Sequence, residues 1–280
     1  MSITCKANVD FVEPPIVEVV CGVQFDAIGL ASGHYGAYWG RIAEDFPITH
    51  DQPPLPSVLE KPVGTETLFD MPFGPDAELP PLRRAFFESR DRSLLIQLQP
   101  SRFLFNWRKT PKATSYPRFS KAYATFEANW KKFDAFVKDV GMSALAINQY
   151  ELTYVNHIPV TSGSVFDAAK RVLPSLLDGI AAEVGGCQVE SVATRLRCSL
   201  PDGRGRLHVS VGYVKNLASA QDLIVFELTT RGPAVSSGRD MDAWFSVAHD
   251  AVIEVFMQLT SKESKTSWGH QGMGHVPSAR

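Results

Sequence analysis

Three short runs of alternating apolar and polar residues in the middle of the chain restrict its possible folds most. They are Arg84–Glu88, Leu94–Gln99 and Phe103–Arg108, and the turn-forming segments Ser89–Arg92 and Gln99–Arg102 separate them. Because successive residues of a strand point to opposite faces, each run has one apolar face and one mainly polar face. The pattern predicts an antiparallel meander that packs against helices on its apolar side.

The polar face of this meander, together with the basic loop that follows it, is the candidate binding site. Its proposed members are Gln97, Gln99, Asn106, Arg108, Lys109, Lys112, Tyr116 and Arg118. Amides and guanidinium groups that converge on one surface could hold a ligand or a partner. The other interpretation is an ordinary solvated sheet face, which the usual exposure of polar residues favours.

A continuous apolar stripe after the meander predicts the longest helix. Apolar residues recur at spacings of three and four from Phe119 to Val140, and Gly141 follows as a stop signal. Pro117 suits the first turn of this helix. An aromatic-rich stripe of this kind is typical of a helix that packs across a sheet.

The second half of the chain repeats the order of elements in the first. A strand at 16–26 and a helix capped by Ser32 precede the meander, while a strand at 149–160 and a helix capped by Ser164 precede three more strands. The second of these helices is expected to run to Gly185-Gly186 with a kink at Pro174. A final helix at 241–259, with Asp240 as its expected cap, ends the second series.

Weak identities support a duplication. Ser32-Gly33 and Arg41 recur as Ser162-Gly163 and Arg171 at an offset of 130 residues. Glu18 also corresponds by position to Glu151, and Arg108 to Arg231.

The predicted fold is therefore α+β, with two repeated units of strand, helix, antiparallel meander and long helix. They span residues 14–141 and 147–260, and residues 261–280 are expected to form a flexible tail. The two units would join into one curved sheet with helices on one face, as in helix-grip or TATA-binding-protein-like duplicates.

The segment 47–81 interrupts the first unit and holds nine of the 19 prolines. We expect a surface excursion that serves as a connecting loop. A flap that covers the sheet is the alternative.

Charge and motifs exclude several functional classes. The net charge of −2 argues against a whole-protein surface for nucleic acid, and phosphate-loop, dinucleotide, zinc-protease and nucleophile-elbow motifs are absent. The seven histidines include no pair at helical metal-ligand spacing, so we predict no metal and no cofactor. Widely spaced cysteines, with Cys21 and Cys198 expected to be buried, and the lack of a long apolar run predict a cytoplasmic protein that does not enter a membrane.

Two further hypotheses remain open at this stage. Residues 100–140 contain nine basic and three acidic residues, so the loop from Arg108 to Arg118 could bind a polyanion or single-stranded RNA or DNA. An enzyme is the other possibility, with a site between the repeats where Glu18, Glu151 or His157 would converge. The catalytic residues and the oligomeric state of such a protein are not indicated by the sequence.

Several segments also resemble a known family: PPIVEVVCGVQF, then LLIQLQPSRFLFNWR followed by YPRF, and HDAVIEVFMQLT with Trp268-Gly269. The chain resembles sporadically distributed, uncharacterised bacterial proteins of about 250 residues. The resemblance implies a bacterial cytoplasmic protein, patchily inherited, with an association with defence or mobile genes and no catalytic residue to carry over. We predict a non-catalytic binding or regulatory module whose partner is a protein or a small ligand rather than a nucleic acid.

Overall fold

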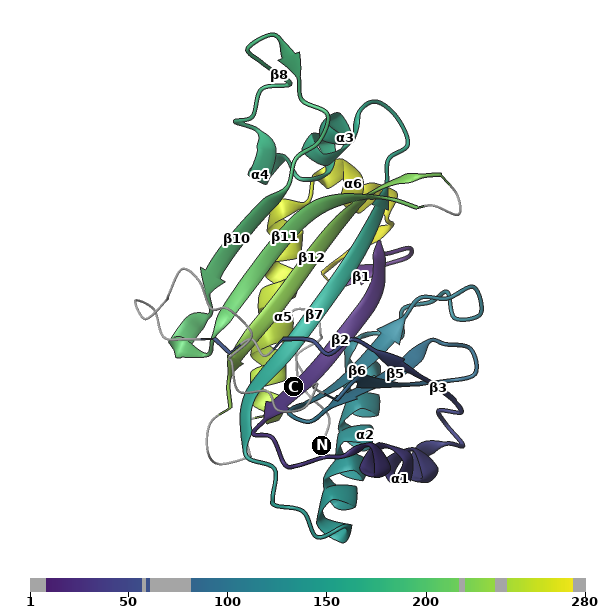
Figure 1. Cartoon of the computed structure of the whole chain (residues 1–280). Helices are drawn as coiled ribbons and strands as arrows, with labels where there is room; N and C mark the ends of the chain where they lie inside the picture. The colour runs from purple at the N-terminus through teal and green to yellow at the C-terminus, as the bar shows by residue number, and fades with distance from the viewer. Residues whose placement is uncertain (1–8, 57–58, 61–81, 217–219, 235–240, 274–280) are drawn as a thin grey trace, which may run out of the picture.

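The computed structural model describes residues 9–56, 59–60, 82–216, 220–234 and 241–273. Its main sheet is built from β2 (Ile16–Phe25), β3 (Ile48–Gln52), β4 (Arg84–Glu88), β5 (Leu94–Gln99), β6 (Arg102–Arg108), β7 (Ile147–Pro159), β10 (Thr194–Ser199), β11 (Arg206–Lys215) and β12 (Asp222–Pro233). The nine strands are antiparallel in the order β10-β11-β12-β7-β2-β6-β5-β4-β3 (Figure 1). The sheet is open, with β10 and β3 as its edges.

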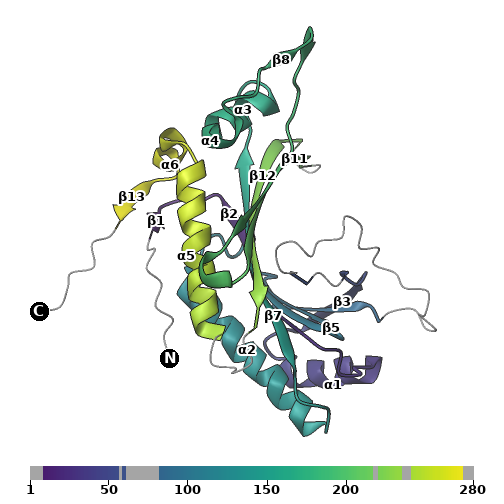
Figure 2. The same cartoon turned by 90° about the vertical axis from the view of Figure 1, so that its left-hand side faces the viewer.

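Helices cover one face of this sheet (Figure 2). They are α1 (Ser32–Ile42), α2 (Phe119–Asp139), α3 (Val165–Val172), α4 (Pro174–Leu177), α5 (Met241–Leu259) and α6 (Lys262–Ser267). Two small ribbons complete the fold: β1 (Val9–Phe11) pairs with β13 (His270–Met273), and β8 (Glu183–Val184) pairs with β9 (Cys187–Gln188). The short 3-10 helix η1 (Pro201–Gly203) joins β10 to β11.

The meander and the long helices lie where the sequence pattern predicts them. β4 and β5 have the predicted bounds, and β6 begins one residue earlier, at Arg102. The stripe of α2 is buried against the sheet, where Phe133 stacks on Phe103 of β6 at 5.3 Å between ring centroids. α5 has the predicted bounds, whereas its expected cap, Asp240, lies outside the described residues.

The strand order is symmetrical about the central pair of long strands. β2 and β7 pair with each other, with Val20 opposite Thr153. Outward from this pair, β6, β5 and β4 follow on one side and β12, β11 and β10 on the other. One hydrophobic core runs beneath both sides, so the two halves share a single sheet and a single core.

Three local predictions differ from the structure at helix ends. Ala31 rather than Ser32 is the N-cap of α1, and Pro117 lies before the N-cap of α2, Arg118. Pro174 ends α3 and begins α4 instead of kinking one long helix, because proline has no N–H to continue the hydrogen-bond ladder. Ser164 caps α3 as predicted and accepts a bond from the Asp167 N–H.

The expected flexible tail is folded as far as residue 273. Ser261 caps α6 and accepts a bond from the Ser264 N–H. Trp268 then packs on Phe256 of α5 and on Phe11 of β1, at 5.6 and 6.3 Å between ring centroids. An aromatic anchor therefore orders a segment whose glycines suggested a loop.

Candidate binding site

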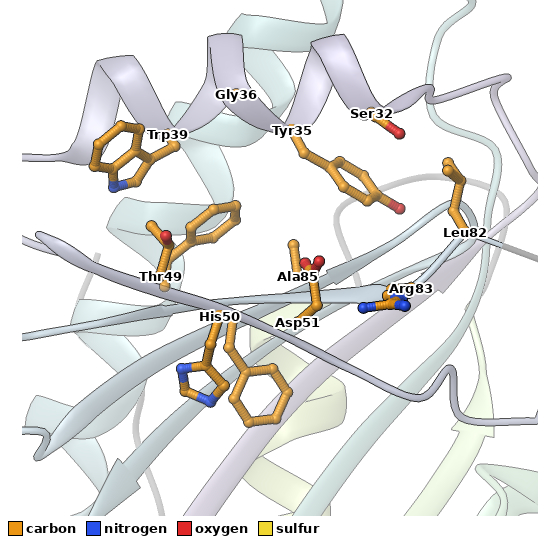
Figure 3. A pocket seen from close by; sticks show the side chains of 12 residues that line it. Ser32, Tyr35, Gly36, Trp39, Thr49, His50, Asp51, Leu82, Arg83 and Ala85 are labelled. Carbon is orange, nitrogen blue, oxygen red and sulfur yellow. The ribbon is translucent and has the colours of Figure 1, made fainter.

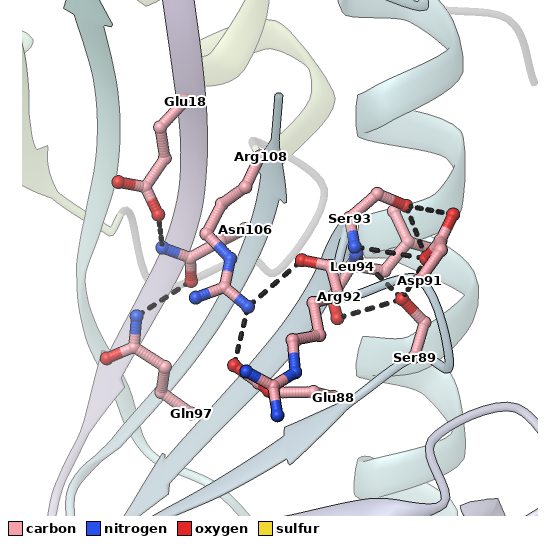
Figure 4. Close-up of polar contacts among 10 residues, drawn as sticks. All are labelled: Glu18, Glu88, Ser89, Asp91, Arg92, Ser93, Leu94, Gln97, Asn106 and Arg108. Atoms are coloured by element: carbon pink, nitrogen blue, oxygen red, sulfur yellow. Dashed lines mark hydrogen bonds and ion pairs between the residues drawn. The ribbon is translucent and has the colours of Figure 1, made fainter. Parts of the chain in front are cut away.

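A chain of polar side chains crosses four strands on the face opposite the helices, and Figure 4 shows its part from Gln97 through Asn106 to Glu18. Arg84 of β4 donates to Gln97 of β5 at 2.8 Å, and Gln97 donates to Asn106 of β6 at 2.8 Å. Asn106 in turn donates to a carboxylate oxygen of Glu18 on β2 at 2.6 Å. Strand alternation places all four side chains on one face, as the sequence predicts for Gln97 and Asn106.

Arg108 lies on the same face but belongs to a separate ion-pair cluster. Its guanidinium donates to the buried Glu88 carboxylate at 2.6 Å and to the Arg92 carbonyl at 3.0 Å. Asp91 fixes the adjoining turn by accepting from Ser89 and Ser93, and the bond from Ser89 is the main reason that its pKa is lowered. Arg108 is therefore engaged in holding the β4–β5 turn.

This face is buried rather than solvated, which contradicts the interpretation that the sequence favoured. Gln97 is 6% exposed, Asn106 3% and Gln149 2%. Part of the cover comes from the proline-rich excursion. Pro56 and Leu55 lie on the polar face, so this part of the segment covers the sheet.

Amide side chains of the face bind the backbone of that segment. Gln99 accepts from the Leu55 N–H at 3.3 Å and donates to the Leu55 carbonyl at 3.1 Å. Arg102 donates to the Pro56 carbonyl at 3.4 Å and to Gln24 at 2.9 Å. These bonds imitate those that a neighbouring strand would make.

Further along, Glu60 is held at both its backbone and its carboxylate. Gln149 of β7 accepts from the Glu60 N–H at 2.8 Å. Arg206 and His208 of β11 contact the Glu60 carboxylate at 2.7 and 2.5 Å. Burial alone would raise the pKa of Glu60, but the bonds from His208 and Arg206 outweigh it and lower the pKa to about 2.

The carboxylates proposed for an enzyme do not converge. Glu18 lies opposite Val155 and Glu151 lies opposite Gly22, so four residues of strand, or about 13 Å, separate them. Glu151 is paired with Arg231 at 2.5 Å. Burial raises the pKa of Glu18, the bond from Asn106 partly opposes that rise, and burial lowers the pKa of His157.

The basic loop is not part of the polar face. Lys109 and Lys112 are exposed in the turn after β6, and Arg118 forms an ion pair with Asp10 at 2.6 Å. Tyr116 lies on the helix side, where its hydroxyl bonds that of Tyr154 at 3.0 Å and its ring contacts Trp107. The sheet therefore separates Tyr116 from Gln97, Gln99 and Asn106.

Carboxylates accompany much of the local positive charge. Five of the nine basic residues in 100–140 form ion pairs in the described part of the chain, and these are Arg108, Arg118, Lys131, Lys132 and Lys138. Among the described residues, the cluster of basic side chains without an ion-pair partner, which a polyanion could contact, is therefore smaller than the sequence suggested.

Sequence reasoning missed the residues that bind Glu60. Gln149, Arg206 and His208 belong to the second half, and no local motif joins them. The alternation of polar residues along β7 and β11 was the available signal, but it gives no distance between strands. Cys198, which we expected to be buried, is exposed on β10, whereas Cys21 is buried as expected.

No group of three or more histidines, cysteines or acidic residues that could hold a metal ion is found in the described ranges. Within the same ranges, no helix has the length and apolar character required to cross a bilayer.

Comparison with known proteins adds little to this description. No family model matches the chain, and no curated protein matches it. A solved structure that it resembles is titled "DynU16 crystal structure, a putative protein in the dynemicin biosynthetic locus". The match has 12% identity and a TM-score of 0.23, covers 62% of this chain and 73% of that one, and carries no argument about function.

Proposed function

We propose that this protein is a non-catalytic binding module that holds an extended peptide segment carrying a carboxylate on the polar face of its sheet. One observation supports this function: the face already binds such a segment of its own chain. Gln99 bonds both backbone groups of Leu55, Gln149 bonds the Glu60 N–H, and Arg206 and His208 hold the Glu60 carboxylate.

The chemistry of these contacts favours recognition over mere support. Buried polar groups stabilise a fold less well than apolar packing, because each must recover the hydrogen bonds it loses to water. Side chains that pair with backbone groups accept many sequences, while a cation pair selects an acidic side chain. A partner segment would therefore compete with residues 53–60, and this competition would make the module regulatory.

We also infer that the two halves are a duplicate pair of the TATA-binding-protein-like kind, joined at β2 and β7. The mirrored strand order supports this, as does the equivalent register of Glu18 opposite Arg108 and Glu151 opposite Arg231. The sequences of relatives would test the duplication. Their aligned first halves should resemble their aligned second halves more closely than chance allows. Failure of that match in a large set of relatives would contradict the inference.

The binding function can be tested by supplying the segment in trans. In one variant, a glycine-serine linker of equal length replaces residues 53–60, which removes the Glu60 carboxylate and the prolines of the segment and leaves a flexible backbone in their place. A blocked peptide that copies residues 53–60 should bind this variant and not the intact chain, whose own segment competes at an effective concentration of about 1 mM.

Two controls define the result. The same peptide with glutamine in place of its glutamate should bind about tenfold more weakly, a loss of about 1.4 kcal/mol. Gln99→Ala with Gln149→Ala in the linker variant should weaken both peptides. A folded linker variant that binds neither peptide at about 1 mM would contradict the proposed function.

A further inference from the structure

A groove of about 710 Å³ lies between α1 and the strands β3 and β4 (Figure 3). It is distinct from the polar face that binds Leu55, Pro56 and Glu60. Its volume falls within the range of pockets that hold small molecules, about 300–1,000 Å³. Register places its two ends: Asp51 lies opposite Ala85, and Thr49 lies opposite Phe87.

One end of the groove is polar and contains an unpaired donor. The Tyr35 side chain extends from α1 toward the strands, and its residue is 9% exposed. Among the described residues its hydroxyl is buried without a hydrogen-bond partner. Asp51 and Arg83 bring one negative and one positive group to the same end, and both are exposed.

The Tyr35 hydroxyl is a donor at neutral pH. Burial, assisted by the nearby charge of Asp51, raises the pKa of Tyr35 to about 12. A buried donor without a partner is unusual in a folded protein and calls for an acceptor. A ligand oxygen in the groove would provide one.

The other end is apolar and rigid. The Trp39 indole N–H donates to the Phe46 carbonyl at 3.0 Å, which fixes the ring at the wall. Phe87 is buried beneath it. Gly36 lines the space between the two ends, and a Cβ placed there would meet nothing within 4 Å.

We propose that this groove binds a small zwitterion with an aromatic or apolar body, for which a free aromatic amino acid is a suitable probe. The ligand carboxylate would accept from the Tyr35 hydroxyl and pair with Arg83. The ligand ammonium would pair with Asp51, and its body would lie against Trp39 and Phe87. The two charged groups, the buried hydroxyl and the aromatic wall then each have a partner of matching charge or polarity.

Calorimetric titration of the full-length protein with L-phenylalanine tests this site. We expect saturable binding at one site with a Kd below about 1 mM. Phenethylamine lacks the carboxylate and 3-phenylpropionate lacks the ammonium group, so each should bind about tenfold more weakly or not at all.

A matched pair of glycine variants separates occupation of the groove from general effects. Gly36→Leu should fill the groove and abolish binding, whereas Gly40→Leu, on the same helix but outside the lining, should retain it. Neither position has a neighbour within 4 Å of a Cβ, so both variants should keep the wild-type melting temperature. Tyr35→Phe keeps the ring and should weaken binding about tenfold.

Three results would overturn the proposal: no saturable binding of L-phenylalanine up to about 10 mM, equal binding by the two glycine variants, or equal affinity for all three probes. If Gly36→Leu fails to fold, Tyr35→Phe and Asp51→Asn provide the test. Unchanged affinity for L-phenylalanine in both would then overturn it.

Discussion

The two faces of the sheet are both buried at its central strands, but by different chemistry. The helix side is an aromatic layer in which Phe133 contacts Phe25, Tyr38 and Phe103 at ring-centroid distances of 5.3–5.9 Å. The opposite side is a layer of amides, arginines and carboxylates covered in part by Leu55, Pro56 and Glu60.

The comparison contrasts burial by apolar packing on one face with burial by hydrogen bonds to a covering segment on the other. When a helix detaches, its apolar side chains and those of the sheet lose both their contacts and their burial, so exposure of the helix face has a large cost in free energy. Hydrogen bonds to a covering segment are exchanged for bonds to water or to another segment, at a small net cost for each. The helix face therefore supplies stability, and the polar face is the one for which we propose recognition.

The largest expected effect comes from breaking the aromatic layer. Phe133→Ala should lower the free energy of unfolding by about 3–5 kcal/mol, because a fully buried ring leaves a cavity. Urea denaturation measures the loss. Phe86→Ala, the same change at a half-buried position of β4, should cost less than half as much; equal losses would contradict the distinction between the faces.

An intermediate effect concerns the pH dependence of the polar face. Folding lowers the pKa of Glu60 from 4.5 to about 2, so its contribution is complete above 4.5 and is lost as pH falls toward 2. That contribution is on the order of 3 kcal/mol for a side chain this well buried. Glu60→Gln should remove this contribution to the loss of free energy of unfolding between about pH 5 and about pH 2, as measured by denaturation.

The smallest effect has the opposite sign. Folding raises the pKa of Glu18, so ionisation of its carboxyl group destabilises the folded state. The stability that the protonated group contributes is complete below pH 4.5 and is lost as pH rises through the folded pKa. Glu18→Gln keeps the acceptor for Asn106 and removes the charge. It should increase the free energy of unfolding at neutral pH by less than about 1 kcal/mol. A clear decrease in thermal stability would instead show that attraction between Arg108 and the Glu18 charge stabilises the fold.

Local pattern was sufficient for the elements that carry a strong period. The alternation in 84–108 and the stripe in 119–140 determine which side chains share a face, because side-chain direction follows directly from backbone geometry. The sequence alone therefore determined the meander, the long helices and the polar grouping of Gln97, Gln99 and Asn106.

Tertiary structure decided what covers that grouping. Glu60 meets Arg206 and His208 across nearly 150 residues of chain, and no local rule measures such a separation. The same limit explains why the sequence did not predict the groove. Tyr35 of α1 and Asp51 of β3 line one groove only after the edge strand β3 has paired with β4. Period and propensity fix the direction of each side chain, but only long-range packing fixes its neighbours.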